Sequence, residues 1–320
     1  MGRHNTRMGI LNFGNQIITD IESYEIHLED PEGTVNEIVD HANAMIESAT
    51  IDRQKLLGIG IALPGLVNSE SGRSYSYFDF EDTTIRTVFE QKFSKPVVVE
   101  NDARAMTLGE WRYGLAQDRS NVLNLNIGWG VGVGMILNGK LYPGGSGFAG
   151  ELGHIRIAQN GLLCHCGKRG CLETVASGTA LARLAKEGIK TGNLSILNKM
   201  VNDDLDAIEA GIVIQAANDG DEYAIEILGE IGSHLGEGIA VLIHLFNPEM
   251  IILGGRISKA DKYIIDPIKQ ALNKFTIEQI RENTKIVVSE LQEHAGVMGA
   301  AALILESLFD NSNIMSIPIY

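Results

Sequence analysis

The chain has 320 residues, of which 44% are hydrophobic, and its 26 basic and 41 acidic side chains leave a formal net charge of −15. This composition excludes a disordered chain, and the acidic balance argues against a surface that binds DNA by itself, because affinity for phosphate requires concentrated positive charge. The length exceeds what one hydrophobic core usually serves, so we expect two lobes. The sequence contains no run of about 18 apolar residues and no signal peptide, so we expect a cytoplasmic protein without a membrane span.

The first third of the chain predicts alternating strands and helices. Strands are expected over residues 7–13, 16–22, 57–63 and 96–100, and helices over residues 33–49, 84–93 and 103–113. Gly14-Asn15 is a hairpin signal between the first two strands, and Thr34 is the expected N-cap of the first helix. The strand over residues 57–63 ends at Pro64-Gly65, which indicates a turn.

Two segments of this part are candidates for contacts with a ligand. Asn101 and Asp102 follow a strand of β-branched residues at its carboxyl end, where the ligands of open α/β sheets gather. A turn without a ligand is the alternative, since both residue types are common in turns for local reasons. Residues 71–82 carry several aromatic side chains, which either pack in the core or belong to a loop that covers a cleft.

The rest of the chain continues the same pattern. Residues 121–127 are expected to form the first strand of a second lobe, followed by a glycine-rich turn and a hairpin around Asn138-Gly139. Residues 178–246 are expected to be largely helical, with strands over 250–253 and 285–289 and a closing helix over 299–308. Glycines within residues 224–245 would let two helices approach closely. The alternation in both halves predicts an α/β protein with two lobes around a cleft.

All the cysteines of the chain lie within one short segment. Cys164, Cys166 and Cys171 follow His154, which lies ten residues before the first of them. Zinc prefers thiolate and imidazole ligands, so this set predicts a closed tetrahedral Cys₃His site with Zn²⁺ in a structural role. Three unrelated thiols are the alternative. A disulfide is disfavoured, because three is an odd number and the first two cysteines are too close in sequence to pair without strain.

Seven segments carry a recognisable pattern. In chain order they are Pro64-Gly65, Glu100-Asn101-Asp102, Gly109-Glu110-Trp111, the glycine run Gly128–Gly139, Ala149–His154 (AGELGH), Cys164–Glu173 (CHCGKRGCLE), and Pro248 with Gly254-Gly255. Together they resemble the ROK family, which groups sugar kinases and sugar-responsive repressors. The resemblance extends over nearly the whole chain. It implies the actin-like ATPase or sugar kinase fold, a ribonuclease H-like α/β architecture in which two lobes hold the sugar in the cleft between them.

The resemblance also implies a division of the chain. Residues 1–118 would form the N-terminal lobe, and residues 119–320 the C-terminal lobe with the zinc motif, whose last helix is expected to return to the N-terminal lobe. Members of the family begin with a strand that ends in Asp-x-Gly-Gly-Thr, and the place of its aspartate falls one residue before Met1. We therefore expect that the sequence starts at an internal methionine or is truncated, and that the coding sequence upstream of Met1 encodes the missing strand.

Each matching residue inherits an expected role from the resemblance. Sugar-binding residues would be Gly65, Asn101, Asp102, Glu151, His154 and Glu173, and zinc ligands would be His154, Cys164, Cys166 and Cys171. Carboxylates suit sugar hydroxyls, because they accept directional, charge-assisted hydrogen bonds. Zinc on the other ring nitrogen of His154 would fix the orientation of its imidazole. In a kinase, Asp102 would be the general base that accepts the proton of the attacking hydroxyl.

The nucleotide side departs from the family pattern. Its expected positions are Gly2, Gly128, Trp129, Gly130, Gly132, Gly254 and Gly255. Arg3 and His4 stand where the family has a glycine and a threonine next to the phosphates, and Trp129 replaces a threonine in the second phosphate turn. Arg104 stands where an asparagine is common. An indole offers no hydroxyl to a phosphate, so the sequence predicts a degenerate ATP site.

An intact sugar side beside an altered nucleotide side suits a sensor better than an enzyme. We therefore expect the sugar-binding effector domain of a transcriptional repressor of carbohydrate metabolism, with a monosaccharide or an N-acetylated sugar as ligand. The alternative is an ATP-dependent sugar kinase of the glucokinase or N-acetylhexosamine kinase type, which would use ATP and Mg²⁺. A zinc-stabilised scaffold without a ligand is a third reading. The resemblance further implies a homo-oligomer, either dimer or tetramer, and contact with DNA only through a winged helix-turn-helix domain that these 320 residues do not contain.

Overall fold

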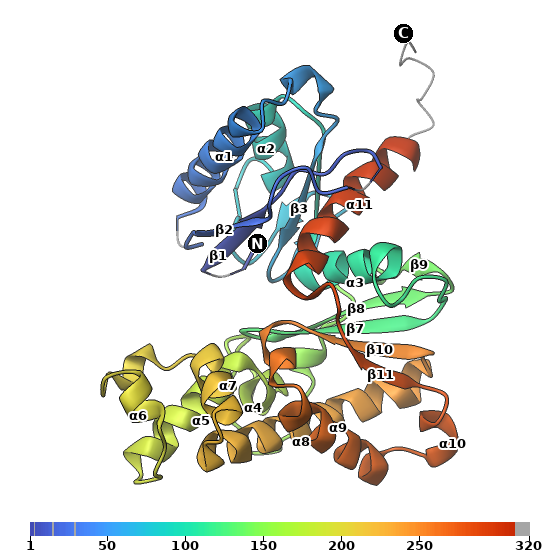
Figure 1. Ribbon diagram of the computed structural model, residues 1–320. Coiled ribbons are helices and arrows are strands. Elements are labelled where there is room, and N and C mark those ends of the chain that lie inside the picture. The colour runs from blue at the N-terminus through green and yellow to red at the C-terminus, as the bar shows by residue number, and fades with distance from the viewer. Residues whose placement is uncertain (3, 15, 29, 311–320) are drawn as a thin grey trace.

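The larger lobe is built on a mixed sheet whose strands, within the described residues, follow the order β11-β10-β7-β8-β9 (Figure 1). These strands are β7 (Val122–Ile127), β8 (Val131–Leu137), β9 (Lys140–Leu141), β10 (Met250–Gly254) and β11 (Lys285–Val288). β10 runs parallel to β7 and β11, whereas β8 runs antiparallel to β7 and β9. β7 and β10 are made mostly of buried aliphatic residues, as expected for strands that are covered on both faces. The computed structural model describes residues 1–2, 4–14, 16–28 and 30–310.

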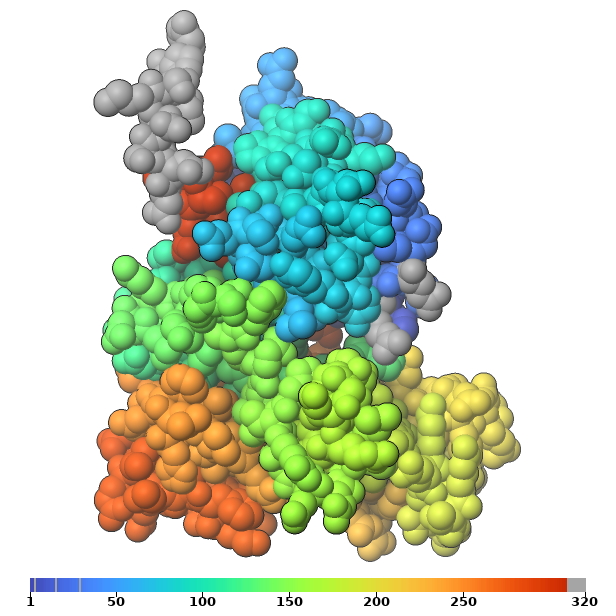
Figure 2. Space-filling model, turned by 180° about the vertical axis from the view of Figure 1, so that it is seen from behind, coloured from blue at the N-terminus to red at the C-terminus, as the bar shows by residue number. Residues whose placement is uncertain are grey.

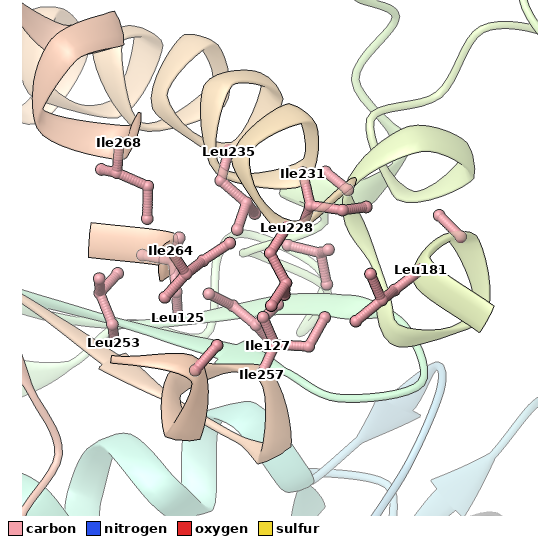
Figure 3. Close-up of a cluster of buried hydrophobic side chains, with 14 of the residues drawn as sticks. Leu125, Ile127, Leu181, Leu228, Ile231, Leu235, Leu253, Ile257, Ile264 and Ile268 are labelled. Carbon is pink, nitrogen blue, oxygen red and sulfur yellow. The ribbon is translucent and has the colours of Figure 1, made fainter. Parts of the chain in front are cut away.

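Helices cover both faces of this sheet. α3 (Asp102–Tyr113) lies on the face toward the smaller lobe, and α8 (Glu222–Phe246) and α9 (Lys262–Phe275) lie on the other (Figure 1). The main hydrophobic core fills the space between the sheet and these last two helices (Figure 3). Its labelled members are Leu125, Ile127, Leu181, Leu228, Ile231, Leu235, Leu253, Ile257, Ile264 and Ile268. A Cβ atom at Gly236 would lie 2.4 Å from the Cβ of Ala271, so the glycines of α8 allow the close helix contact that the sequence predicts.

The smaller lobe contains short pairs of strands between helices. β1 (Asn5–Met8) pairs antiparallel with β2 (Glu22–Glu25), β3 (Ile59–Leu63) pairs parallel with β6 (Val97–Asn101), and β4 (Val67–Asn68) pairs antiparallel with β5 (Arg73–Ser74). α1 (Pro31–Ser48) and α2 (Ile85–Phe93) enclose its core. α11 (Ala295–Asp310) packs against α3 and β3 (Figure 1). The two-lobed α/β fold predicted from the sequence is confirmed, while the boundary between residues 118 and 119 stays a prediction.

The described residues form further helices. They are α4 (Glu173–Ala176), α5 (Gly178–Lys190), α6 (Leu197–Met200), α7 (Ala210–Asn218) and α10 (Glu278–Arg281), with 3-10 helices η1 (Arg53–Lys55), η2 (Leu152–His154), η3 (Leu205–Ala207), η4 (Arg256–Ala260) and η5 (Gln292–His294). Among the helices in the described part of the chain, none combines the length and the apolar character that a membrane crossing requires.

β1 and β3 face each other across an apolar channel. In the part of the chain that the structure describes, β1 pairs only with β2 and β3 only with β6, so one edge of each strand has no partner strand. The channel opens from the cleft between the lobes, and α1 and α11 line it with apolar side chains, among them Met45, Ile46, Ile304 and Leu305. The amine of Met1 donates to the carbonyl oxygen of Ala62 at 2.6 Å, so this carbonyl of β3 faces the channel.

The predicted N-terminal hairpin is present, but its strand bounds are wrong. The strands expected over residues 7–13 and 16–22 pair instead at their far ends, where Asn5 lies opposite Glu25 and Met8 lies opposite Glu22. Nearer the turn the pairing is reduced to one bridge, between Leu11 and Ile17. Asn15 of the predicted turn lies outside the described residues.

The predicted cap of the first helix is also wrong. Asp30 is the N-cap of α1, and its carboxylate accepts a hydrogen bond from the amide of Gly33. Pro31 occupies the first helical position, where the missing amide hydrogen costs nothing. The hydroxyl of Thr34 donates to the carbonyl oxygen of His27 at 3.0 Å and so connects the helix to the preceding segment.

The aromatic segment over residues 71–82 serves both purposes that the sequence allowed. Phe78 is buried in the core of the smaller lobe, while Tyr77 lines the cleft. Tyr75 contacts Phe148 of the larger lobe edge to face, with 5.6 Å between the ring centroids. One part of the segment therefore packs in the core, and another part connects the two lobes.

Candidate functional site

A cleft of about 1470 Å³, which includes the channel, lies between the two lobes, and the molecule is visibly hollowed there when it is seen from behind (Figure 2). All the residues expected to bind sugar line it: Gly65, Asn101, Asp102, Glu151, His154 and Glu173. So do Gly2, Gly128, Trp129, Gly130, Gly132 and Gly255 of the expected nucleotide side. Gly254, the last residue of β10, is buried instead, against Met106 and Asn124.

The side chain of Asn101 is held in place by two hydrogen bonds to the backbone. It ends β6 and is the N-cap of α3, with its Oδ1 accepting from the amide of Arg104 at 3.2 Å. Its Nδ2 donates to the carbonyl oxygen of Gly65 at 3.0 Å. Because the cap and the Gly65 contact fix this side chain, the orientation of Asn101 is set before any ligand arrives.

Asp102 opens α3 and carries the carboxylate that projects into the cleft. Its Oδ1 accepts from the amide of Ala103 at 2.8 Å, and its Oδ2 accepts from Nδ2 of Asn126 at 3.2 Å. Burial raises the pKa of Asp102, and the ammonium of Met1 acts in the opposite direction. Burial also lowers the pKa of that ammonium, to about 6.

Asn126 is a site residue that the sequence reasoning missed. It lies near the carboxyl end of β7, two residues before Gly128, and its amide orients the carboxylate of Asp102. The strand-end rule that singled out Asn101 and Asp102 also applies to the end of β7, so this signal was available.

Glu173 begins α4 and is tied to the glycine turn that follows β7. Its Oε2 accepts from the amide of Val131 at 3.1 Å. A Cβ atom at Gly130 would lie 2.1 Å from the same oxygen, so the carboxylate fits only because this position is glycine. The glycine thus makes room for a residue that is expected to bind sugar, independent of any phosphate.

Glu151 and His154 stand on either end of η2 and face the cleft. Oε2 of Glu151 lies 3.8 Å from Nε2 of His154. Burial raises the pKa of Glu151, and the negative charges of Asp102 and Glu173 add to the effect. Three carboxylates therefore meet in one cleft, where hydroxyl donors from a ligand would relieve their repulsion.

The three cysteines gather on the other side of the His154 imidazole, next to Nδ1. Sγ of Cys164 lies 3.6 Å from Nδ1 of His154, and Sγ of Cys166 lies 3.7 Å from Sγ of Cys171. All four ligand atoms lie within 4.8 Å of one another. A tetrahedral zinc ion with ordinary bond lengths requires about 3.6 Å between nitrogen and sulfur and about 3.8 Å between two sulfurs. The donor set and its spacing therefore fit zinc.

The thiols of this cluster differ in their surroundings. Burial raises the pKa of Cys171 to about 12 and also raises the pKa of Cys164. The pKa of the exposed Cys166 is lowered, chiefly by the backbone amide of Lys168. Two buried thiols that resist ionisation need a cation to hold them as thiolates, which is the usual condition of a structural metal site.

His165 is a second residue that the sequence reasoning missed. Its Nδ1 lies 3.1 Å from Oε1 of Glu173, and its ring meets the ring of His154 edge to face. Nδ1 also lies 3.9 Å from Sγ of Cys164. Its place between two expected zinc ligands was the available signal, but the spacing of the sequence does not show toward which neighbour the ring turns.

The glycine turn after β7 is bound to the start of α5. The amide of Gly178 donates to the carbonyl oxygen of Gly128 at 2.8 Å. Thr179 donates both its amide and its hydroxyl to the carbonyl oxygen of Trp129, at 3.3 and 2.8 Å. The next amide, of Ala180, is capped by the hydroxyl of Ser177 at 3.1 Å. These first amides of the helix therefore already have acceptors within the protein.

The indole of Trp129 lies across the cleft from the start of the smaller lobe. Its ring and the ring of His4 are in edge contact, with centroids 4.7 Å apart. Nδ1 of His4 lies 3.1 Å from Nδ1 of His27, so one imidazole donates to the other. Gly2 donates its amide to the carbonyl oxygen of Asn5. Arg3 lies outside the described residues.

One further departure from the family pattern, at Arg104, and the retained glycine at position 132 both have structural explanations. Arg104 is buried. Its Nε donates to a carboxylate oxygen of Glu100 at 2.7 Å, and its guanidinium also donates to the carbonyl oxygen of Val67 at 2.8 Å. It thereby connects β6 and β4 beneath the cleft. A Cβ atom at Gly132 would lie 2.9 Å from the Cβ of Ala103, so the glycine lets α3 and β8 approach each other closely.

Comparison with known proteins adds to this geometry. The model of the ROK family matches residues 1–307. The DNA-binding transcriptional dual regulator NagC of Escherichia coli strain K12 is 32% identical over 317 residues, which are 97% of this chain and 75% of that protein. A ROK family glucokinase from Streptomyces griseus, solved with glucose and AMPPNP, superposes with a TM-score of 0.84 at 31% identity and covers 96% of this chain and 97% of its own. A ROK family transcriptional regulator homologous to the Escherichia coli MLC protein gives a TM-score of 0.83 at 32% identity, over 97% of this chain and 77% of its own.

Proposed function

The chain belongs to the ROK family, and on that premise we propose that it is the sugar-sensing region of a transcriptional repressor of carbohydrate metabolism. Its ligand would be a monosaccharide or an N-acetylated sugar. Relatives of similar identity include both a transcriptional regulator and a glucokinase, so the choice between sensing and catalysis depends on the site itself.

The polar groups of the cleft support a sugar ligand. Asp102, Glu151 and Glu173 can accept hydrogen bonds from hydroxyls, and Asn101 is oriented by its own backbone contacts. His154 presents Nε2 to the cleft while its Nδ1 faces the thiols. A ring with several hydroxyls matches several directional acceptors better than an apolar or anionic ligand does.

The observation that carries the sensor proposal lies at the glycine turn of Trp129. In a phosphate cradle, backbone amides and hydroxyls point at the ligand. Here the amides of Gly178 and Thr179 and the hydroxyl of Thr179 are consumed by carbonyl oxygens of the turn. The indole of Trp129 and the imidazole of His4 occupy the adjoining space. A triphosphate would have to displace these contacts.

We propose zinc as the structural metal of the cysteine segment. His154, Cys164, Cys166 and Cys171 would hold it, and it would supply a positive charge that keeps the buried thiols ionised. His154 would then be fixed by the metal at one nitrogen and free to contact sugar at the other. Through this imidazole, the metal would pre-organise the sugar side of the cleft.

An ATP-dependent sugar kinase is the second candidate, and the position of Asp102 favours it. A buried carboxylate with a raised pKa, oriented by Asn126, is suited to accept a proton from a sugar hydroxyl. Mg²⁺ would accompany ATP in that case. The two candidates share the sugar site and differ only in what the other half of the cleft binds.

Two measurements decide between these functions. Calorimetric titration with hexoses and N-acetylhexosamines should give saturable binding that Glu151→Ala abolishes. A coupled assay with ATP and Mg²⁺ should give no turnover. Turnover that disappears in Asp102→Asn would establish the kinase instead, and the absence of any sugar binding would contradict both proposals.

Contact with DNA would require a further domain. A chain with a net charge of −15 offers little to attract phosphates, so sugar would act on DNA only through a linked domain whose position changes with the cleft. The assembly of several copies, predicted from the resemblance, would be one way to connect sugar binding in the cleft with a change in DNA binding.

A further inference from the structure

We propose that the cleft contains a second saccharide subsite on the indole of Trp129, so that its preferred ligand is a disaccharide or another glycoside whose first ring occupies the sugar site. This inference rests on the proposed sugar site and goes beyond it, because it assigns a ligand to the half of the cleft where the phosphate contacts are lost. Four features of the described residues support it.

The first feature is adjacency. Gly130 packs directly on the carboxylate of Glu173, and Trp129 is the next residue in the same turn. Because Val131 also binds this carboxylate, the turn cannot move away from the sugar site without breaking that bond. A substituent on a sugar ring held by Glu173 would therefore extend over the turn that carries the indole.

The second feature is the exposure of the indole. Trp129 is 37% exposed although it lies in a cleft, and it is one of the large apolar side chains that the fold leaves uncovered there. The face of an indole carries negative charge density, and the C–H bonds of a sugar ring carry a slight positive charge, so the two stack favourably. A triphosphate would gain nothing from the same surface.

The third feature is rigidity. The carbonyl oxygen of Trp129 accepts both bonds from Thr179, and its ring is in edge contact with His4 at 4.7 Å. His4 is in turn bonded to His27. An aromatic platform that is held from both lobes loses little conformational entropy on binding, which favours its use as a fixed contact surface.

The fourth feature is the presence of charged side chains in the wall of the same cleft. Glu209 and Arg256 both line the cleft and approach each other at 3.5 Å, and Arg183 also lines it. A carboxylate beside guanidinium groups offers an acceptor and several donors, the set that a second ring with hydroxyls requires. The apolar face and these charged side chains together have the composition of a carbohydrate subsite.

The test compares disaccharides with their own monosaccharides on the 320-residue protein. Calorimetry would use glucose against maltose and cellobiose, and N-acetylglucosamine against its β-1,4-linked dimer. We expect at least one disaccharide to bind about tenfold more tightly than its monosaccharide, which corresponds to ~1.4 kcal/mol. Trp129→Ala should reduce this ratio to about one, and Trp129→Phe should retain part of it, because a phenyl ring still offers a face.

The chain's only other tryptophan supplies the control. Trp111 donates to the carbonyl oxygen of Arg119 and does not line the cleft. Trp111→Phe should keep the ratio and leave Trp129 as the sole source of tryptophan fluorescence, which should then shift more with the disaccharide than with the monosaccharide.

Each other outcome overturns the inference. Tight monosaccharide binding with a wild-type ratio of one removes the second subsite and leaves the proposed function standing. A ratio that survives Trp129→Ala places the gain elsewhere. Quenching of Trp129 by AMPPNP in competition with the disaccharide assigns the indole to a nucleotide. Absence of all sugar binding overturns this inference together with the proposed function.

Discussion

Gly130 has no Cβ atom, and the carboxylate of Glu173 occupies the space where that atom would lie. Gly130→Ala must therefore displace Glu173 or open the turn, and either change removes an acceptor from the proposed sugar site. We expect sugar affinity to fall at least about tenfold, the loss of roughly one charge-assisted hydrogen bond. Calorimetric titration measures this loss.

The matched control is Gly211→Ala in α7, where a Cβ atom would meet nothing within 4 Å. That substitution should leave sugar affinity unchanged and should stabilise the protein by about 0.5–1 kcal/mol, because alanine is the better helix former. Equal affinities for the two variants would show that Glu173 does not contact the ligand.

Asp102 makes a prediction about stability and pH. Burial raises its pKa in the folded protein above the unfolded value of about 3.9. A carboxyl group of this kind stabilises the fold fully below its unfolded pKa, and that contribution is lost as the pH rises through the folded pKa. At pH 7 the buried charge is therefore a cost. Asp102→Asn should raise the free energy of unfolding at pH 7, by on the order of 1 kcal/mol, and the gain should vanish near pH 4.

Urea denaturation at both pH values measures this difference. Asp40→Asn, at an exposed position of α1, is the control and should change the free energy of unfolding by less than about 0.5 kcal/mol. A variant Asp102→Asn that is less stable at pH 7 would mean that the bonds from Ala103 and Asn126 to the ionised carboxylate outweigh its burial.

At the scale of single residues, the sequence was most informative where the residue type alone indicates a chemical role. The cysteines and His154 were recognisable from their spacing, and the structure brings their ligand atoms within 4.8 Å. Asn126 and His165 were missed, because an amide near a strand end and a histidine between cysteines acquire their partners only when distant segments meet. Trp129 was recognised as a departure from a pattern, but its contact with His4 was not.

The cysteine segment is an element whose order should depend on metal. Cys164→Ser should reduce zinc from about one ion per chain to a small fraction, because three remaining ligands leave the shell open. The same variant should weaken sugar binding, since His154 and the segment that leads to Glu173 lose their anchor. Elemental analysis and calorimetry measure the two effects.

His165→Ala provides the matched control for this element. His165 approaches Glu173 at 3.1 Å and Cys164 only at 3.9 Å, so its loss should leave the zinc content intact while it perturbs the sugar site. Zinc that is retained in Cys164→Ser, or lost in His165→Ala, would assign the ligands differently.

Secondary structure followed from local pattern wherever the pattern was long and periodic. The helix expected over residues 84–93 and the strand expected over residues 96–100 appear as α2 and β6 with ends that differ by one residue. The predicted bounds of the hairpin strands are wrong because only the partner strand decides which residues pair. The residue type of Thr34 predicts a cap, but Asp30 before Pro31 is the stronger signal.

At the scale of the whole molecule, the proposed sugar site lies between the two lobes. Asn101 ends a strand of the smaller lobe, Glu151 and Glu173 belong to the larger lobe, and Asn68 already bridges the lobes by donating to the carbonyl oxygen of Ser146 at 3.0 Å. A sugar that contacts both lobes binds the folded state alone. At a hundred times its Kd it should raise the free energy of unfolding by about 2.7 kcal/mol.

Urea denaturation with and without sugar measures this stabilisation. Glu151→Ala, treated with the same sugar concentration, should show no gain. Equal stabilisation of the variant would indicate a solvent effect of the sugar and not a bound ligand. The fold at this scale was predictable, because alternating strands and helices with glycine turns allow few architectures, whereas the contacts between the lobes depend on loops that carry no periodic signal.

The channel between β1 and β3 has a practical consequence for anyone who handles this protein. Backbone groups on an unpaired strand edge form a template with which a foreign strand can pair, and among the described residues two such edges border the same apolar channel. Concentrated samples should therefore aggregate on warming at a lower temperature than expected for a protein with a net charge of −15. A short aliphatic peptide that binds in the channel should prevent this aggregation.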